Sequence, residues 1–251
     1  MSAALWYAIF ALLLFHQGST LYLEQNCGIG SVFSPNPWLV KILPDPSSNI
    51  TCTGSLINER FVLTAASCID NKTKLLLRLG EGFVRGYSKY QYEEISATKA
   101  IVHRLYTSTT YEHNIALVRL ATSVVYKKNI KPICIIVNVE KVPKAPTFEI
   151  EIKKSEVPKK DKVNIFKQFS KWISKFFTGT FPDQKSKVNK PPEALAIGSP
   201  LTKKIDNSEV VHQYGILSHH NTETMKDVYT NVMAYADWII PIALDVHIIM
   251  A

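Results

Sequence analysis

The sequence lacks the patterns that usually mark a nucleotide, zinc or calcium site. It contains no phosphate-binding glycine loop, no cysteine and histidine ligands at zinc spacing and no EF-hand loop. An internal repeat of about 20–50 residues is also absent, which excludes a solenoid or a propeller. Since 46% of the residues are hydrophobic, the composition does not indicate global disorder. We therefore expect a globular protein that uses no metal ion or cofactor and has no nucleic-acid partner.

Long apolar runs are scarce, and the only one lies at the start of the chain. The run from Ala3 to Phe15 contains no charged side chain and is followed by small residues up to position 20. It is too short to cross a bilayer comfortably, which argues against the alternative of a membrane anchor. Residues 1–20 are therefore predicted to be a secretory signal peptide, which would place the mature protein outside the cell.

Cysteine is rare as well, with four residues in the whole chain. An even count behind a signal peptide favours two disulfide bonds over metal or redox chemistry, and it leaves three pairings open. Export would also make two Asn-X-Thr sequons, at Asn49 and Asn71, glycosylation sites. The cysteines are Cys27, Cys52, Cys68 and Cys134.

The excess of positive charge is confined to one part of the chain. The formal net charge is +8, and residues 153–190 account for all of it with eleven lysines against three acidic residues. Within this part, residues 163–177 place Ile, Phe and Trp at helical spacing, with lysines on another face. Two interpretations stay open: the aromatic face packs on the protein core, or the helix binds an anionic polysaccharide, a membrane surface or an acidic protein. The lysines of that face are Lys167, Lys171 and Lys175.

The rest of the chain is predicted to form mainly short strands, which are separated by residues typical of turns. Strands are predicted at 38–43, 52–57, 60–65, 74–79, 90–103, 115–120, 197–201 and 210–218. Residues 232–243 have helical spacing instead. Many short strands followed by one terminal helix indicate an all-β barrel or sandwich.

Several sequence blocks occur in the order found in one protease family. The blocks are CTGSLI at 52–57, FVLTAASC at 61–68, HNIALVRL at 113–120, IKPIC at 130–134, GSPL at 198–201, YGILS at 214–218 and VYTNV at 228–232. They resemble the C-G-G-x-L-I, V-L-T-A-A-H-C, D-I-A-L-L-x-L, I-x-P-I-C and G-G-P-L blocks and the last strands of the chymotrypsin/trypsin family. The similarity runs from about residue 27 to residue 243 and fails between 139 and 196. Within the family, the blocks look like those of insect-type clip-family and related secreted proteases.

The resemblance implies a fold and a division of the chain. The family fold is all-β, with two packed antiparallel six-stranded barrels and a C-terminal helix. Residues 21–36 would form a short N-terminal segment, residues 37–245 the double barrel, and residues 139–190 a divergent lysine-rich part of it. The family's disulfide pattern implies the pairs Cys52–Cys68 and Cys27–Cys134, the second of which would hold the N-terminal segment.

The resemblance also implies where the catalytic residues would lie. At each of these positions, the residue present cannot perform the catalytic role. The histidine, aspartate and nucleophilic serine positions fall on Ser67, Asn114 and Ile197. A hydroxyl cannot serve as the general base, a carboxamide cannot stabilise an imidazolium, and isoleucine has no nucleophilic atom. The oxyanion-hole glycine and the aspartate that receives the freed N-terminus fall on Leu195 and Ala196.

Activation and specificity features are altered too. Residues 27–38 contain no Lys or Arg, so the basic activation site of the family is absent, and the base of the specificity pocket falls on Pro191. We expect a secreted, non-catalytic homologue that binds an extracellular protease or inhibitor as cofactor, decoy or adhesion module. The first alternative is an anionic glycan or lipid binder acting through 153–190. The second is residual or rebuilt peptidase activity, with Ser199 as nucleophile near His113.

Overall fold

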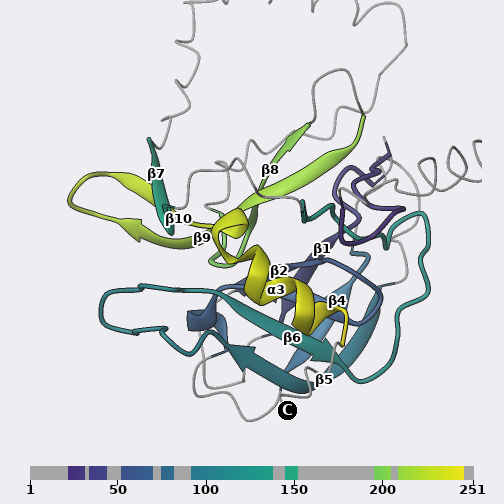
Figure 1. Ribbon diagram of the computed structural model, residues 1–251. Helices are drawn as coiled ribbons and strands as arrows, with labels where there is room; N and C mark the ends of the chain where they lie inside the picture. The colour runs from purple at the N-terminus through teal and green to yellow at the C-terminus, as the bar shows by residue number, and fades with distance from the viewer. Residues whose placement is uncertain are drawn as a thin grey trace, which may run out of the picture. The chain divides into compact units, whose positions relative to one another are not determined.

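The computed structural model describes residues 22–31, 34–43, 52–69, 75–81, 92–137, 145–151, 195–204 and 209–245. The first half of these residues forms a closed barrel of antiparallel strands in the spatial order β1-β2-β3-β6-β5-β4 (Figure 1). The strands are β1 (Leu39–Ile42), β2 (Cys52–Leu56), β3 (Phe61–Thr64), β4 (Leu76–Leu79), β5 (Glu93–Val102) and β6 (Ala116–Leu120). Their order and positions agree with the strands predicted from the sequence.

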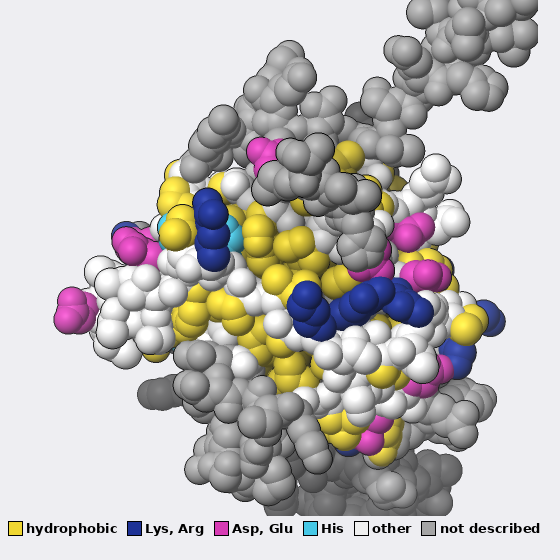
Figure 2. Space-filling view, turned by 60° about the horizontal axis from the view of Figure 1, so that its bottom comes forward, with side chains coloured by type: hydrophobic (Ala, Val, Ile, Leu, Met, Phe, Trp, Pro, Cys, Tyr) yellow, Lys and Arg dark blue, Asp and Glu magenta, His cyan; other side chains and the backbone are white. Residues whose placement is uncertain are grey.

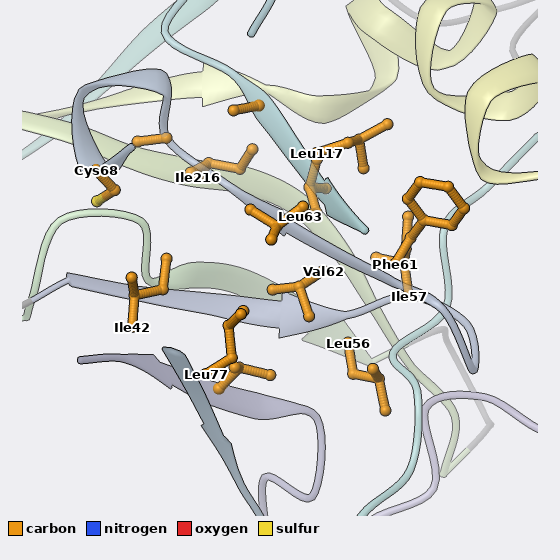
Figure 3. Close-up of a cluster of buried hydrophobic side chains, with 14 of the residues drawn as sticks. Ile42, Leu56, Ile57, Phe61, Val62, Leu63, Cys68, Leu77, Leu117 and Ile216 are labelled. Carbon is orange, nitrogen blue, oxygen red and sulfur yellow. The ribbon is translucent and has the colours of Figure 1, made fainter. Parts of the chain in front are cut away.

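The barrel closes because β1 pairs with both β2 and β4. Successive side chains of a strand point to opposite faces, so every second residue of these strands faces the interior. Val40 and Ile42 of β1 lie opposite Leu79 and Leu77 of β4, and all four are at most 1% exposed. Figure 3 shows Ile42 and Leu77 in the same cluster of buried side chains. The barrel interior is thus a packed apolar core.

Strands β2 and β3 are buried on both faces, unlike β1. Their outer faces are covered by the C-terminal part of the chain, since Ile216, Tyr235 and Ile239 belong to the same buried cluster as the barrel side chains. Figure 3 draws Ile216 in the same cluster of buried side chains as Leu63 of β3. This double burial explains why β2 and β3 are such uniformly apolar or small-residue strands.

The turn between β2 and β3 is built by Asn58. Its side-chain oxygen accepts hydrogen bonds from the backbone N–H groups of Arg60 and Phe61, at 2.9 and 2.8 Å. Such an Asx turn substitutes a side chain for a backbone acceptor. The amide nitrogen of Asn58 also donates to the backbone oxygen of Ala243, at 2.8 Å, which ties the turn to the C-terminal helix.

The second half of the described chain forms one four-stranded antiparallel sheet, in the order β7-β10-β9-β8. The strands are β7 (Thr147–Glu151), β8 (Pro200–Lys204), β9 (Val211–Asn221) and β10 (Lys226–Asn231). The sequence predicted a second six-stranded barrel here, whereas the described residues supply four strands in an open sheet. Residues 152–194, which connect β7 to β8, lie outside the described ranges.

Two details of this sheet differ from the sequence-based expectation. Strand β7 falls where the family resemblance fails, and it was not predicted. Strand β8 begins at Pro200, later than the predicted start at 197, because Gly198 has a positive φ of 84° that interrupts extended backbone.

The predicted C-terminal helix over 232–243 is present in two parts. Residues Val232–Tyr235 form a 3₁₀ turn (η2), and α3 (Ala236–Ala243) continues from it. The side chain of Asn231 caps the turn by accepting from the backbone N–H of Met233. None of the helices within the described ranges is long and apolar enough to span a membrane.

The N-terminal segment is held against the barrel by covalent and backbone contacts. Cys27 forms a disulfide with Cys134, which is one of the two pairs that the resemblance implies. Leu23 donates to the backbone oxygen of Ile135, at 3.0 Å. Gly28 adopts a φ of 69°, and a Cβ there would lie 2.2 Å from the backbone oxygen of Val211. A side chain is therefore excluded at position 28.

Candidate functional site

The positions named from the sequence as degenerate catalytic positions lie together in the structure. Ser67 sits in the 3₁₀ turn η1 (Ala66–Cys68), and Asn114 immediately precedes Ile115 and strand β6. Their contact is reciprocal: the backbone N–H of Ser67 donates to Asn114 Oδ1 at 2.9 Å, and Asn114 Nδ2 lies 3.2 Å from Ser67 Oγ. Residues far apart in sequence thus form one polar contact.

Asn114 is fully buried, and both polar atoms of its side chain have hydrogen-bond partners. Its side-chain nitrogen donates to Ser218 Oγ at 2.8 Å and lies 3.3 Å from the Ser218 backbone oxygen. Its backbone oxygen accepts from Thr230 Oγ1 at 3.1 Å. A buried carboxamide with this many partners is well satisfied, because it can donate and accept at once. We call the side chains of Ser67, Asn114 and Ser218 the serine–asparagine network.

The network contains no ionisable group. A general base needs a group that titrates near the working pH and lies within hydrogen-bond reach of the proton it takes. Serine hydroxyls and a carboxamide do not supply one. The network therefore orients side chains by neutral hydrogen bonds, and it joins the start of β6 to η1 and to β9.

The disulfide Cys52–Cys68 connects the segment of Ile197 with this network. It is the second pair that the resemblance implies. Cys52 begins β2 and makes a parallel bridge with Ile197, while Cys68 follows Ser67 directly. The backbone N–H of Thr53 donates to the backbone oxygen of Ile197, at 2.9 Å. The structure thus gathers all three positions that the sequence singled out.

The backbone after Ile197 is tightly constrained. Gly198 donates to the backbone oxygen of Leu217 at 2.8 Å, and Leu217 donates to the backbone oxygen of Ser199 at 2.9 Å. A Cβ on Gly198 would lie 2.0 Å from the backbone oxygen of Thr53. Because only glycine fits there, the position of Ile197 relative to β2 is fixed.

Ser199 is not presented to solvent. It is 6% exposed, and its hydroxyl forms a hydrogen bond with the hydroxyl of Thr53 at 2.9 Å. The position assigned to the oxyanion glycine, Leu195, is 55% exposed. The Ala196 backbone oxygen accepts from the Ser199 N–H at 3.0 Å. Ser199 is therefore a structural residue of the joint between β2 and the second sheet.

His113 is adjacent to Asn114 in sequence but makes its contacts elsewhere. Its Nδ1 forms a hydrogen bond with the Tyr235 hydroxyl at 2.9 Å, and its ring stacks on His103 with centroids 5.0 Å apart. A second stacked pair joins Tyr111 to His219, with centroids 4.7 Å apart. His219 Nδ1 in turn lies 3.2 Å from Ser218 Oγ, so this pair borders the serine–asparagine network.

Sequence reasoning did not single out four of these aromatic and histidine side chains, or Ser218, as site residues. The YGILS block at 214–218 includes Ser218, and its match was the one signal that pointed to it. The other four, which show no pattern because they meet only in three dimensions, are His103, Tyr111, His219 and Tyr235.

Several predicted features fall outside the described residues. These are the signal peptide 1–20, the sequons at Asn49 and Asn71, the pocket position Pro191 and the lysine face with Lys167, Lys171 and Lys175. Among the residues that are described, no group of three His, Cys, Asp or Glu side chains is arranged to hold a metal ion.

Comparison with known proteins connects this geometry to one family. The family model described as "Trypsin" matches residues 26–148, which contain the whole six-stranded barrel. Among solved structures, the Drosophila Grass clip serine protease of the Toll pathway superposes with a TM-score of 0.58. That match covers 96% of this chain and 80% of that chain at 18% identity, so it shows the fold.

Curated relatives match less than half of the chain. Vitamin K-dependent protein C of Mus musculus is 37% identical over 100 residues, which cover 40% of this chain and 21% of that protein. Inactive CLIP domain-containing serine protease A28 of Anopheles gambiae is 32% identical over 126 residues, or 48% of this chain and 34% of that protein. Inactive serine protease scarface of Drosophila melanogaster is 30% identical over 106 residues, covering 41% of this chain and 16% of that protein. The chain thus spans between about a sixth and a third of the length of these relatives.

Proposed function

Since the chain is a trypsin-like serine protease homologue, we propose that it acts without catalysis, as a secreted binding protein in an extracellular protease pathway. Its role would be that of a cofactor, a decoy for inhibitors or an adhesion module. Loss of catalytic groups leaves the surface loops of a scaffold free to bind other molecules, because function resides in sites carried by a fold and not in the fold itself.

The serine–asparagine network is the observation that carries this proposal. Peptide hydrolysis in this family needs a serine activated by an imidazole whose charge a carboxylate stabilises. Ser67 and Asn114 occupy the positions matched to the imidazole and the carboxylate, and they hydrogen-bond each other as neutral groups. The network has no proton acceptor for a nucleophile and no negative charge for an imidazolium.

The surroundings of Ile197 support the same conclusion. Its aliphatic side chain stands at the position matched to the nucleophile, and the neighbouring Gly198 leaves the backbone no room to shift. Ser199, the alternative nucleophile, is buried and hydrogen-bonded to Thr53. His113, its proposed base, is hydrogen-bonded to Tyr235. Both side chains have structural partners, which argues against rebuilt peptidase activity.

The names of two relatives point in the same direction. A28 of Anopheles gambiae and scarface of Drosophila melanogaster are both called inactive, and they are 32% and 30% identical to this chain over 126 and 106 residues. A non-catalytic role is therefore in keeping with proteins of similar sequence.

A fluorophosphonate probe tests the catalytic part of the proposal. The purified mature protein should remain unlabelled under conditions in which an active trypsin-family protease is labelled to completion. The Ser199→Ala variant should give the same blank result. Labelling of the wild type that disappears in Ser199→Ala would overturn the proposal, because it would show an activated serine at that position.

A kinetic assay tests the binding part. The mature protein is added to an active clip-type protease, with and without its serpin-type inhibitor, and the rate of substrate cleavage is followed. A saturable change in cleavage or inhibition rate supports a cofactor or decoy role. Unchanged rates up to concentrations well above those of the enzyme and inhibitor would contradict both roles.

The proposal includes secretion and glycosylation, which depend on residues 1–20 and on Asn49 and Asn71. Expression of the whole chain in a secreting cell should release protein whose N-terminus lies near residue 21. Treatment with an amide-cleaving glycosidase should lower its mass, and Asn49→Gln with Asn71→Gln should abolish that decrease. Retention of the protein inside the cell would contradict this part.

A further inference from the structure

Residues 103–115 form a loop between β5 and β6 whose two ends meet at a pair of histidines. The backbone N–H of His103 donates to the backbone oxygen of Ile115, at 3.1 Å. The imidazole rings of His103 and His113 stack with an interplanar angle of 18°. The base of the loop is therefore closed by two imidazoles in direct contact.

The same histidines rest on the C-terminal part of the chain. The edges of Tyr235 and Trp238 each approach His103 with centroids 5.3 Å apart, and His113 is hydrogen-bonded to the Tyr235 hydroxyl. Tyr235 belongs to the buried core cluster. This contact fastens the base of the loop to η2 and α3.

The outer part of the loop is fastened to the second sheet by a third histidine. Tyr111, which has a φ of 56°, stacks on His219 of β9 with an interplanar angle of 23°. The loop is thus held at its base and near its tip, and an imidazole takes part in both contacts. We call residues 103–115 the histidine-clamped loop.

The charged groups around the base of the loop are mostly unfavourable to an imidazolium. Burial lowers the pKa of His103, and the neighbouring His113 and Arg104 lower it further. Glu112 adjoins His113 in sequence, and Asp237 lies between η2 and Trp238. Among the salt bridges of the described residues, none joins Glu112 or Asp237 to His103 or His113, so no carboxylate is paired with the histidines at the base.

Near the tip of the loop, the surroundings of His219 also disfavour its protonated form. Burial lowers the pKa of His219, the neighbouring His220 lowers it further, and Glu149 of β7 opposes this effect. His220 itself is paired with Asp227 of β10, at 2.5 Å. The carboxylate of Asp227 is therefore already engaged with His220.

We propose that the histidine-clamped loop is a proton-sensitive latch, docked on η2, α3 and β9 while His103 and His219 are neutral and released when these two side chains take up protons. Because burial and neighbouring groups lower the pKa values of His103 and His219, the docked loop binds protons more weakly than the released loop. Protonation therefore favours release. Docking is therefore complete above the ordinary histidine pKa of about 6.5 and weakens as the pH falls below it. Release would uncover the side of the serine–asparagine network that Tyr111 and His219 border.

Hydrogen–deuterium exchange tests the latch in the mature wild-type protein. Protection factors, corrected for the intrinsic pH dependence of exchange, are compared at pH 7.4 and pH 5.5 for peptides covering 103–115 and for peptides covering β2 and β3. The loop should lose protection by about threefold or more relative to the core strands. Equal loss in the loop and the core, or no loss in the loop, would overturn the proposal.

Two variants separate the latch from general acid destabilisation. His103→Phe combined with His219→Phe retains aromatic rings at both contacts but cannot be protonated, so the loop should keep its protection at pH 5.5. His220→Gln leaves both ring contacts and both imidazoles of the latch in place, so the loop should still lose protection at pH 5.5. If the double variant fails to fold, His219→Phe alone should still remove the pH effect at Tyr111, and persistence of the full effect would contradict the proposal.

Discussion

Asn114 donates a hydrogen bond from its side-chain amide to the hydroxyl of Ser218, at 2.8 Å, and both residues are buried. The same nitrogen lies 3.3 Å from the backbone oxygen of Ser218, which can only accept. A carboxylate has no proton to give to that oxygen. The position is therefore fitted to a carboxamide.

We expect Asn114→Asp to destabilise the protein at neutral pH. The substitution buries a negative charge and removes the donor to Ser218, and leaving a buried polar group without a partner costs about 1–3 kcal/mol, more for a charge. Urea denaturation of the wild type and the variant measures the difference. Adding Ser67→His should recover part of the loss, because an imidazole would stand beside the new carboxylate.

Asn221→Asp is the matched control for this change. Asn221 is only partly buried, and its side-chain oxygen only accepts, from the backbone N–H groups of Glu223 and Thr224 at 3.0 Å. A carboxylate accepts those bonds equally well, so this variant should be close to neutral. Equal stability of the Asn114 and Asn221 variants would show that position 114 has no preference for a carboxamide.

Gly198→Ala should lower the stability of the protein more than a conservative substitution at a neighbouring position does. The new Cβ would lie 2.0 Å from the Thr53 backbone oxygen at a φ of 84°, so β2 or the 195–199 segment must move. Such backbone strain adds to the steric clash, and we expect a loss of about 3 kcal/mol or more. Thermal denaturation measures the loss.

Ser199→Ala provides the comparison for Gly198→Ala at the next position. It removes the hydrogen bond to Thr53 without backbone strain and should cost about 1 kcal/mol. If the two variants melted at the same temperature, the close approach of Gly198 to β2 would not be a constraint on the fold.

The two disulfides should differ in their contribution to stability. Cys27–Cys134 spans a sequence separation of 107, and Cys52–Cys68 spans 16. Chain-entropy arguments give about 4–5 kcal/mol for the longer loop and about 3 kcal/mol for the shorter one. Paired Cys→Ala variants, compared by urea denaturation, should therefore show a larger loss for Cys27 with Cys134. The reverse order would indicate that Cys52–Cys68 stabilises chiefly through local packing beside Ile197.

Sequence patterns predicted the barrel well because its strands carry their own signals. Alternation in 39–42 and 76–79 and uniformly small or apolar residues in 52–56 reflect burial on one face or on both. Strand β7 was missed because residues 147–151 lie where family blocks are absent, and pairing with β10 decides its structure. Pairing partners are not visible in a local pattern.

The site was predicted only as far as the family blocks reach. Ser67, Asn114 and Ile197 lie inside or beside such blocks, so their proximity was expected. The stacking of Tyr111 on His219 joins residues of different halves of the chain, and neither belongs to a periodic pattern. Contacts of this kind depend on how the β5–β6 loop folds back, and sequence spacing does not determine that.

The lysine-rich part of the chain leads to the last prediction, retention on immobilised heparin. On the face of the molecule drawn in Figure 2, lysine and arginine side chains are interspersed with acidic ones. The whole net charge of +8 instead resides in residues 153–190. A local excess of this size should hold the mature protein on heparin above about 0.15 M salt, with retention falling steeply as salt screens the charges.

Replacing three lysines at two places separates local from total charge. Lys167→Glu, Lys171→Glu and Lys175→Glu together should move elution to much lower salt. Lys99→Glu, Lys128→Glu and Lys203→Glu change the net charge by the same amount at exposed positions outside 153–190, and they should move it much less. Equal shifts would mean that heparin senses only the total charge, and wild-type elution at physiological salt would remove anionic glycan as a ligand. A difference between the two variants would assign the interaction to 153–190, because charge number is matched and only its location differs.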